Sequence, residues 1–594
     1  MDKIIILDMG GQYCHLLARR VRQLNVYSEI KNSDVNIDEL KDAKGIIISG
    51  GPNSVYGEDA PKYDEKLFSL NIPILGLCYG HQLMASALGG EVKKGESQEY
   101  GSATLKVKID EGVLAGLSTL ETVWMSHGDV VEKLPDGFEI FGSTDDCKTA
   151  AVGNEKKQYY GLQFHPEVTH TPNGMKIIEN FVLKICECKQ EWNMHNFLEK
   201  KIEEIKEQVG DKGVFLLVSG GIDSTVCFAL LEKALGSKRV YGLHVNNGLM
   251  RKNESRSVKK GLTELGFKLH VVKAEDDFLN PLAGVYDPEE KRKIIGEKFI
   301  EVQQKVVDKL ELDNNKWLLG QGTIYPDTIE SKGTKHSDLI KTHHNRVEAV
   351  QKLIDEGKVI EPISELYKDE VRKLALELKL PKSLIYRHPF PGPGLGIRCL
   401  CVEEPEKIKN EAGINKRINE IAEKYTMNGK LLPIKSVGVQ GDSRTYSYAA
   451  VVMGKSNWSK LGELSTEITN NIPEVNRVVW LLHFSNFEGR VKQFSVTRPR
   501  IELLRDADEI VMEKLDPKSK FQIWQFPVVL IPYGVRGESI ILRPVYSKEA
   551  MTAEFAKLKP KVLKRIVDSL LKIFGINAVF YDITNKPPAT IEWE

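Results

Sequence analysis

The chain has 594 residues, too many for one hydrophobic core, so we expect three or four domains. Lys and Arg together number 83, as do Asp and Glu, and this balance gives no reason to expect a nucleic acid or a membrane as a partner. The eight cysteines include C-x-C pairs at Cys186/Cys188 and Cys399/Cys401, whose spacing fits neither a disulfide framework nor the usual zinc sites. The apolar run before Asp8 is too short for a signal peptide, and no later run approaches ~18 apolar residues. We therefore expect a cytoplasmic protein with free thiols.

The first predicted domain, residues 1–188, alternates apolar strands with helical stretches. The runs KIIILDMG, AKGIIISGG and IPILGLC are continuous and end in glycines, which is typical of strands buried on both faces of a parallel sheet. Helical stretches follow the first and the third run. This order predicts a doubly wound α/β domain.

A second α/β domain is predicted over residues 189–400. It opens with a charged amphipathic stretch, KQEWNMHNFLEKKIEEIKEQVG, and continues with the apolar strands in KGVFLLVSGG, RVYGLHVNNG and FKLHVVKA. It closes with RHPFPGPGLGIR, whose prolines and glycines exclude a helix. The sequence thus indicates two successive doubly wound parallel-sheet domains.

The remaining region, residues 401–594, reads as α+β and contains an internal repeat. VGVQGDSRTYSYAAVV and YGVRGESIILRPVYS are each followed by a helical stretch and then by an apolar strand, VNRVVWLL or INAVFYDI. Two modules, at about 430–485 and 525–594, would each run strand, helix, strand. We interpret them as a duplicated module.

One cysteine stands between two glycines where a strand turns into a helix. In GLCYGHQ, Gly76 and Gly80 permit a tight corner at Cys78, the form of a nucleophile elbow with sulfur in place of oxygen. The start of the next helix favours a thiolate and offers N–H groups to an oxyanion. A buried structural cysteine beside a Gly-rich turn is the alternative.

A base for this cysteine is available in YYGLQFHPEVTH. Residues i and i+2 of an extended stretch point to the same face, so His165 and Glu167 can lie side by side. A nucleophilic thiol needs such a base and an orienting group.

Together these motifs resemble the class I glutamine amidotransferases over residues 1 to about 185. The resemblance implies that Cys78 attacks the glutamine carboxamide, that His165 carries the proton, that Glu167 orients the imidazole, and that ammonia is released. It implies an oxyanion hole from the backbone N–H groups of Gly51 and Tyr79. Positions that match the family's glutamine site are Gln82, Ser126, His127, Gly128 and Asp129.

A phosphate loop is predicted between a strand and a helix in VFLLVSGGIDSTV. Its glycines let backbone N–H groups approach phosphate, and the helix N-terminus favours the anion. The sequence lacks GxxxxGK[ST], so this is not a Walker loop, and a Ser/Gly-rich helix start is the alternative. SGGxDS resembles the signature of the ATP pyrophosphatases, which implies ATP, Mg²⁺ held by Asp223, and no organic prosthetic group. The predicted ATP-binding residues are Ser219, Gly220, Gly221, Ile222, Asp223, Ser224 and Thr225.

The stretch at 322–350 suits a mobile lid that shields an adenylate from water. Lys341, His343 and His344 cluster in its arm, and a solvated basic surface is the alternative interpretation. The lid carries RVEAV where many bacterial relatives have a Gly-rich VGGL, which leaves its motion open. Another departure, QEYG in place of REYG at 98–101, lies in the first domain.

The segments LGQGTIYPDTIES, IKTHHN, RHPFPGPGLGIR, LLPIKSVGVQGDSRTYSY and YDITNKPPATIEWE resemble the GMP synthetase (glutamine-hydrolysing) family in order along the chain. This implies xanthosine 5′-monophosphate (XMP) as acceptor: its C2 oxygen attacks the ATP α-phosphate, and ammonia then displaces AMP. Positions that match the family's XMP site are Arg292, Asp442, Gln525, Lys586 and Glu592.

The C-terminal region is longer than the dimerisation domain usual in bacterial relatives. We expect its second module to take a partner's place and favour a monomer over a dimer. Two other functions stay open: another glutamine-dependent adenylating ligase, such as an NAD⁺ synthetase or an asparagine-forming enzyme, and a catalytically silent nucleotide-binding protein.

Overall fold

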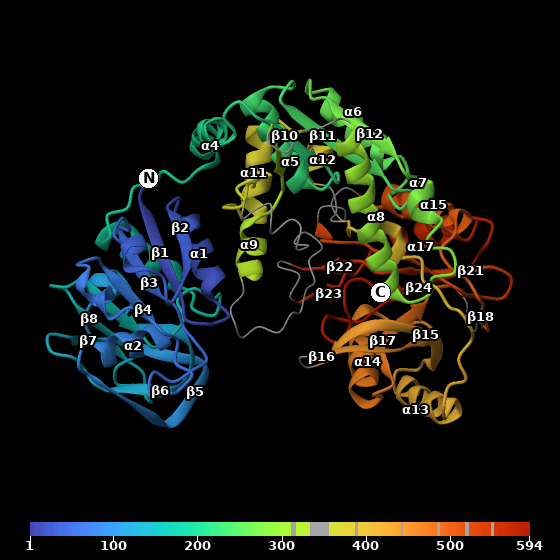
Figure 1. The fold of residues 1–594 in the computed structure, drawn as a ribbon. Helices are drawn as coiled ribbons and strands as arrows, with labels where there is room; N and C mark the ends of the chain where they lie inside the picture. The colour runs from blue at the N-terminus through green and yellow to red at the C-terminus, as the bar shows by residue number, and fades with distance from the viewer. Residues whose placement is uncertain are drawn as a thin grey trace. The chain divides into compact units, whose positions relative to one another are not determined.

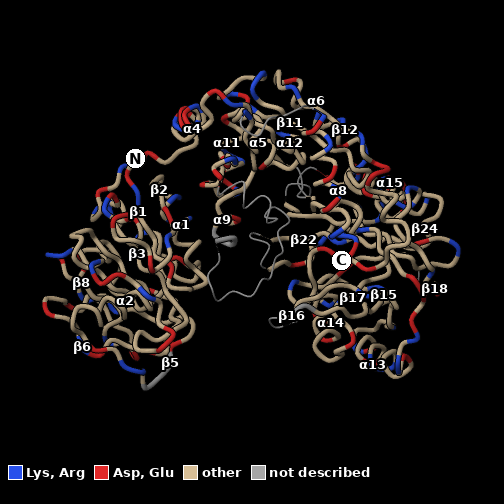
Figure 2. Tube along the Cα trace, in the orientation of Figure 1, with Lys and Arg blue, Asp and Glu red and all other residues tan. Residues whose placement is uncertain are grey.

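The structure is a computed structural model that describes residues 1–309, 316–332, 356–386, 390–440, 443–483, 488–516, 522–547 and 552–594. The chain forms two compact units: the first holds Met1–Lys200, and the second begins at Lys201. Figure 2 shows acidic and basic residues interspersed along the trace. Across the described residues, no helix has both the length and the apolar character that crossing a membrane requires.

The first unit is built on a nine-stranded sheet (Figure 1). The neighbouring strands β2, β1, β3, β4 and β9 are parallel to one another. The pairs β9–β8, β8–β7, β7–β5 and β5–β6 are antiparallel. The chain adds β2 on one side of β1 and β3, β4 and β9 on the other, so the predicted doubly wound parallel sheet is confirmed. The antiparallel extension was not predicted. In spatial order the strands are β2 (Tyr27–Asn32), β1 (Lys3–Asp8), β3 (Gly45–Ile48), β4 (Ile74–Leu77), β9 (Tyr159–Leu162), β8 (Ala151–Asn154), β7 (Glu139–Ser143), β5 (Glu91–Val107) and β6 (Leu120–Lys133).

The central strands of this sheet are buried because they carry apolar side chains on both faces. Every residue of β3 and β4 is buried, and their side chains join one core with Leu83 and Met84 of the following helix. The helices of the unit are α1 (Cys14–Gln23), α2 (Tyr79–Ala87) and α3 (Gly174–Glu179), with shorter helical turns at Ile37–Leu40, Glu65–Ser69, Gly112–Leu114 and Asn180–Ile185, and α4 (Met194–Val209) runs across the boundary at Lys200.

The second unit contains a five-stranded parallel sheet. β11 and β12 are added on one side of β10, and β13 and β14 on the other, so this second predicted doubly wound sheet is also confirmed. The point between β10 and β13 is where such sheets bind ligands. In spatial order the strands are β12 (Leu269–Lys273), β11 (Val240–Asn246), β10 (Gly213–Leu217), β13 (Trp317–Gly320) and β14 (Val359–Ile360). The helices are α5 (Ile222–Leu235), α6 (Glu254–Thr263), α7 (Glu275–Leu279), α8 (Pro288–Lys309), α9 (Tyr325–Lys332), α11 (Lys368–Glu377) and α12 (Lys382–Ile385), with a 3-10 turn at Gly394–Ile397.

A six-stranded mixed sheet forms the C-terminal region. Its spatial order is β15 (Asn428–Gln440), β16 (Ser443–Met453), β17 (Val475–Leu481), β24 (Ile576–Asp582), β21 (Glu538–Leu542) and β19 (Val528–Ile531). The helices are α13 (Glu411–Lys424), α14 (Trp458–Asn471), α15 (Arg498–Lys514) and α17 (Pro560–Leu570). Two-residue strands complete the region: β18 (Arg490–Val491), β20 (Tyr533–Gly534), β22 (Val545–Tyr546) and β23 (Glu554–Phe555).

The predicted duplication is visible in the order of these strands. Each half has an antiparallel strand pair, a helix, and a strand parallel to the second member of the pair. The halves meet where β17 pairs antiparallel with β24, with Trp480 opposite Tyr581 at the centre. The expectation of strand, helix, strand needs one correction. The stretch 437–452 spans the end of β15 and most of β16, so the first module opens with two strands. The second module likewise opens with the antiparallel pair β19 and β21.

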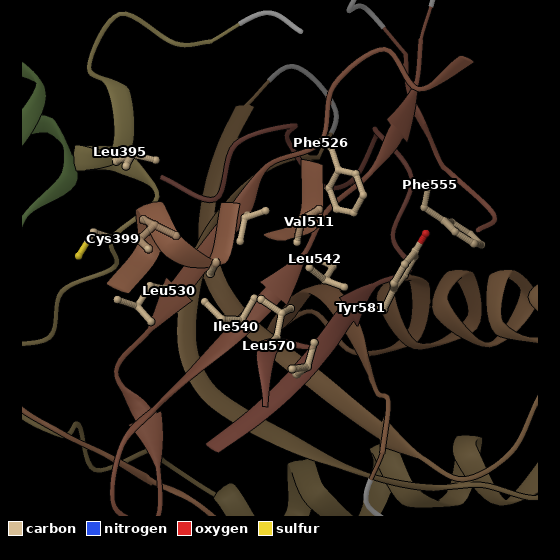
Figure 3. Packing of buried hydrophobic residues seen from close by; sticks show 14 of the residues in the cluster. Leu395, Cys399, Val511, Phe526, Leu530, Ile540, Leu542, Phe555, Leu570 and Tyr581 are labelled. Carbon is tan, nitrogen blue, oxygen red and sulfur yellow. The ribbon is translucent and has the colours of Figure 1, made fainter. Parts of the chain in front are cut away.

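The two sheets of the second unit share one hydrophobic core. The cluster extends from Phe215 on β10 to Tyr581 on β24. Figure 3 shows Cys399 and Leu530 close together in this core, and Leu400 N donates to Leu530 O at 2.9 Å. The predicted domain limits at 188 and 400 stay predictions.

Candidate active sites

Cys78 stands at a sharp corner between β4 and α2. Its φ of 49° and ψ of −104° are strained for a residue with a side chain. A Cβ on Gly76 would lie 2.5 Å from the Gly80 carbonyl oxygen, and one on Gly80 would lie 2.3 Å from the Ile48 carbonyl oxygen. Both flanking positions therefore require glycine, and the corner holds the thiol at the edge of the sheet.

His165 and Glu167 form a buried pair after β9. His165 Nδ1 lies 2.7 Å from Glu167 Oε1, and the side chains are 6% and 1% exposed. The backbone is fixed on both sides, because Thr171 Oγ1 donates to His165 O and Arg20 Nε donates to Glu167 O. Burial lowers the pKa of His165, but the Glu167 carboxylate and the Cys78 sulfur outweigh burial and raise it to about 10. The imidazole thus holds a proton beside the thiol.

The loop after β3 passes close to this cysteine and histidine. A Cβ on Gly50 would lie 3.0 Å from His165 Cε1 and 3.7 Å from Cys78 Cβ. Gly51 is the next residue along this loop, and Tyr79 is the first residue of α2, where a backbone N–H has no acceptor within the helix. The structure therefore places Tyr79, and the loop that carries Gly51, near the thiol.

The predicted glutamine-site residues lie along β6 and on α2. Cys78 Sγ donates to Ser126 O at 3.4 Å, and Gln82 Nε2 donates to Asp129 O at 2.8 Å. Gly128 lies between Ser126 and Asp129 on the same strand. The carboxylate of Asp129 accepts hydrogen bonds from two hydroxyl groups that we did not predict, Ser54 Oγ at 2.5 Å and Tyr56 OH at 3.0 Å. Both hydroxyls belong to the SGGPNSVYG stretch, whose glycines were the only signal used there.

The predicted phosphate loop connects β10 to α5 and is held by its own hydroxyl groups. Ser219 Oγ and Ser224 Oγ lie 3.0 Å apart, and Ser219 Oγ also accepts from Gly221 N at 3.2 Å. Gly220 has a φ of 85°, which favours glycine. Within the described residues, the buried Thr225 Oγ1 has no hydrogen-bond partner. The start of α5 at Ile222 turns its first N–H groups toward this loop.

The loop after β13 meets the phosphate loop at the switch point of the sheet. A Cβ on Gly322 would lie 3.0 Å from Ser224 N, and Cys227 Sγ donates to Gln321 O at 3.4 Å. Asp223 Oδ2 pairs with Lys368 at the start of α11, a residue that we did not predict. Asp223 Oδ1 is buried with no partner among the described residues, so one carboxylate oxygen is available to a cation.

Three of the predicted XMP residues, Arg292, Gln525 and Glu592, lie around the end of the chain. Gln525 Nε2 donates to Glu592 Oε1 at 3.0 Å, and Arg292 Nη2 donates to the Glu594 carbonyl oxygen. The backbone of Lys586 exchanges two hydrogen bonds with the backbone of Ala553, at 2.7 and 3.1 Å. Asp442 and the lid residues Lys341, His343 and His344 lie outside the described residues.

Several buried charges around this tail were not predicted. Arg398, fully buried, holds Glu592 through Nε at 2.9 Å and Nη2 at 2.7 Å. Arg477 and Arg543, also fully buried, both pair with Asp582, at 2.8 and 3.1 Å. Trp593 Nε1 donates to the Asp582 carboxylate at 3.0 Å. The guanidinium of Arg477 lies 4.7 Å from the centroid of the Trp593 ring. The tail is therefore locked by charge-assisted hydrogen bonds.

Known proteins resemble every part of this arrangement. Residues 5–185 match the glutamine amidotransferase class-I family, residues 192–295 match NAD synthase, and residues 514–593 match the GMP synthase C-terminal domain. The relative "Probable GMP synthase [glutamine-hydrolyzing]" of Leptospira interrogans is 46% identical over 604 residues, covering 100% of this chain and 99% of its own length. The GMP synthase of Dictyostelium discoideum is 40% identical and covers 100% of this chain and 94% of its own.

The GMP synthase of Brachyspira hyodysenteriae is 45% identical and is matched over 97% of its own length, but it covers only 81% of this chain. The present chain is thus longer than some members and as long as others. It belongs to the family of glutamine-hydrolysing GMP synthases.

Proposed function

We propose that this GMP synthase divides its reaction between a glutaminase centre at Cys78 in the first unit and an adenylating centre at Ser219–Thr225 in the second. Glutamine supplies ammonia, ATP activates XMP, and ammonia replaces the activated oxygen to give GMP. The observation that carries the first half is the buried His165–Glu167 pair at 2.7 Å beside a cysteine held in a strained elbow.

At the first centre, Cys78 Sγ attacks the carboxamide carbon of glutamine. His165 holds the proton that the thiol gives up, since its pKa is raised to about 10. The N–H groups of Gly51 and Tyr79 stabilise the oxyanion of the tetrahedral intermediate. The C–N bond then breaks, His165 returns the proton to the leaving ammonia, and water hydrolyses the thioester to glutamate. We assign Asp129 to the α-ammonium group of glutamine, because its carboxylate is held in place by Ser54 and Tyr56.

At the second centre, the loop Ser219–Ser224 binds the pyrophosphate part of ATP. The purine C2 oxygen of XMP attacks the α-phosphorus, and the P–O bond to pyrophosphate breaks. Thr225 Oγ1, buried and without a partner among the described residues, adds a hydroxyl donor for phosphate. Asp223 Oδ1 would hold Mg²⁺, which neutralises phosphate charge when bound. Ammonia then attacks the purine C2 atom, and the bond between C2 and the activated oxygen breaks. AMP leaves and carries that oxygen on its phosphate.

XMP is assigned to the residues around the tail. Arg292, Asp442, Gln525, Lys586 and Glu592 supply the cationic and hydrogen-bonding groups that a nucleotide monophosphate needs. The contact between Gln525 and Glu592 supports a common site for these two. Lys341, His343 and His344 are assigned to a lid over the adenylate.

We further propose that the protein is a monomer. Its support is the duplication, since two like modules already pair through β17 and β24 within one chain. Sedimentation velocity at nanomolar protein should give a single species of monomer mass, and a stable dimer under these conditions would overturn the proposal.

One assay tests the proposed reaction. Purified protein with ATP, Mg²⁺, XMP and glutamine should release AMP, and XMP should be consumed with it. Deamido-NAD⁺ or aspartate in place of XMP should give no AMP, which separates this function from the related ligases. Absence of AMP with XMP would mean a silent nucleotide-binding protein.

A further inference from the structure

A buried pair of side chains lies next to the proposed glutamine site. His127 Nε2 is 3.1 Å from Glu99 Oε2, and His127 Nδ1 is 3.1 Å from the carbonyl oxygen of Asp129. The side chains of His127 and Glu99 are 1% and 10% exposed. Thr144 Oγ1 contacts both Glu99 oxygens, at 3.0 and 3.3 Å. The mechanism proposed above uses neither Glu99 nor Thr144.

The hydrogen bond to a backbone oxygen fixes one proton on His127. A carbonyl oxygen only accepts, so Nδ1 of His127 must carry a proton toward Asp129. Nε2 and the Glu99 carboxyl group are within hydrogen-bond distance, so a second proton lies between them on one group or the other. The imidazole therefore makes two hydrogen bonds, one to Glu99 and one to the Asp129 backbone.

The other titratable side chains near this pair, Cys147 and His81, are neutral. The sulfur of Cys147 belongs to one cluster with Glu99 and His127, all ligand atoms lying within 4.8 Å of one another. Burial raises the pKa of Cys147 to about 11, so it stays a neutral thiol. Burial lowers the pKa of His81 to about 3, so this imidazole stays neutral too. Thr144, the remaining contact, does not titrate in this range.

The bond to Asp129 connects the pair to glutamine. The Asp129 carbonyl oxygen accepts from His127 Nδ1 and also from Gln82 Nε2, at 3.1 and 2.8 Å. Its carboxylate is held by Ser54 and Tyr56. Two donors on the carbonyl and two on the carboxylate leave Asp129 little freedom, and a preorganised carboxylate binds a cation with less loss of entropy.

We propose that Glu99 and His127 act as a positioning dyad: Glu99 orients the imidazole of His127, and His127 Nδ1 fixes Asp129 for binding the α-ammonium group of glutamine. The inference rests on the proposed glutamine site and names two positioning residues for it. Neither residue belongs to the group of Cys78, His165 and Glu167 that carries out the reaction. The dyad therefore sets the KM for glutamine and leaves the chemistry at Cys78 unchanged.

Two amide variants separate the two hydrogen bonds of the imidazole. The side-chain amide nitrogen of Asn can replace Nδ1, and that of Gln can replace Nε2. His127→Gln keeps the bond to Glu99 and loses the bond to Asp129. The double variant His127→Asn, Glu99→Gln keeps a donor for Asp129 and removes the buried charge that Asn would leave unpaired. His195→Gln, on a 66% exposed side chain of the same unit, is the matched control.

For His127→Gln we expect the KM for glutamine to rise about five- to tenfold, the loss expected for one hydrogen bond, with kcat within about twofold. Glu99→Gln should raise KM as well, and the double variant should recover most of the loss. The saturation constant for alkylation of Cys78 by a diazoketone analogue of glutamine should change in parallel, because it reports binding without turnover.

An unchanged KM in His127→Gln, or equal KM values in His127→Gln and the double variant, would overturn the dyad. The ammonium-dependent reaction should stay at the wild-type rate in every variant, because it needs only the second unit. Failure of the proposed function is a separate result, since wild-type protein would then show no glutamine-dependent activity at all.

Discussion

Glu167 Oε1 lies 2.7 Å from His165 Nδ1, and both side chains are buried within two residues of each other in the chain. This carboxylate, with the Cys78 sulfur, outweighs the effect of burial on the imidazole and raises its pKa to about 10. The proton on His165 therefore depends on a charge that a single substitution removes.

Glu167→Gln should lower kcat with glutamine by roughly 10²- to 10⁴-fold, the range for general acid–base groups, and leave the rate with ammonium salts intact.

Glu167→Gln should also change how the stability of the first unit depends on pH. The folded pKa of His165, about 10, lies above its ordinary 6.5, so its charge stabilises the fold fully below about pH 6.5 and ceases to do so as pH rises through 10. Urea unfolding of the first unit should show that wild type has a larger free energy of unfolding than Glu167→Gln at about pH 6.5. This difference should become smaller as pH rises to about 10. A constant difference would contradict the assignment.

Substitutions at the two centres should have unequal effects. Cys78→Ala should abolish GMP formation from glutamine and leave formation from ammonium salts nearly intact, because the second unit keeps its phosphate loop. Asp223→Ala should abolish both reactions. GMP formation measured with each nitrogen source gives the comparison, and loss of the ammonium reaction in a folded Cys78→Ala protein would refute the division of labour.

Local sequence predicted those features that depend on neighbouring residues. The corner at Cys78 follows from glycines two residues away, and the doubly wound sheets follow from apolar runs that end in glycines. The duplicated module was also detectable from the sequence. The strand that opens each module was not predicted. In the first module LLPIKSVGVQ and SRTYSYAAVV, which form β15 and β16, were interpreted as one extended stretch around 437–452.

Contacts between distant segments were not predictable in the same way. Arg398 and Glu592 are 194 residues apart, and Lys368 and Asp223 are 145 apart. Their pairing depends on which strands lie side by side, and a lone arginine or lysine in a sequence is usually solvated. Glu99 was missed for the same reason, since only the pairing of β5 with β6 brings it to His127.

The elbow should not tolerate a methyl group at Gly80. A Cβ there would lie 2.3 Å from the backbone oxygen of Ile48, which cannot move without displacing β3. We expect Gly80→Ala to destabilise the first unit by about 1–3 kcal/mol and to lower glutaminase activity, because the shift reaches Cys78. Ser86→Ala, at an exposed position of α2, is the matched control and should be neutral. Equal thermal unfolding of the two variants would mean that the corner relaxes freely.

The buried pair of Lys291 and Glu594 gives the sharpest stability prediction for the second unit. Lys291 is 0% exposed, and its Nζ also donates to Gly396 O and Cys399 O at 3.2 and 3.3 Å. Lys291→Met leaves the Glu594 carboxylate buried without its partner, which should cost about 3–5 kcal/mol in urea unfolding.

Lys293→Met, on the same helix but 74% exposed, should change stability by less than about 0.5 kcal/mol. Adding Glu594→Gln to Lys291→Met removes the unpaired charge, so the double variant should be more stable than Lys291→Met alone. It should still bind XMP more weakly than wild type, because Arg292 contacts the backbone of the same residue. If Lys291→Met is as stable as Lys293→Met, the pair does not hold the tail, and the tail depends on Arg398 and Arg477 instead.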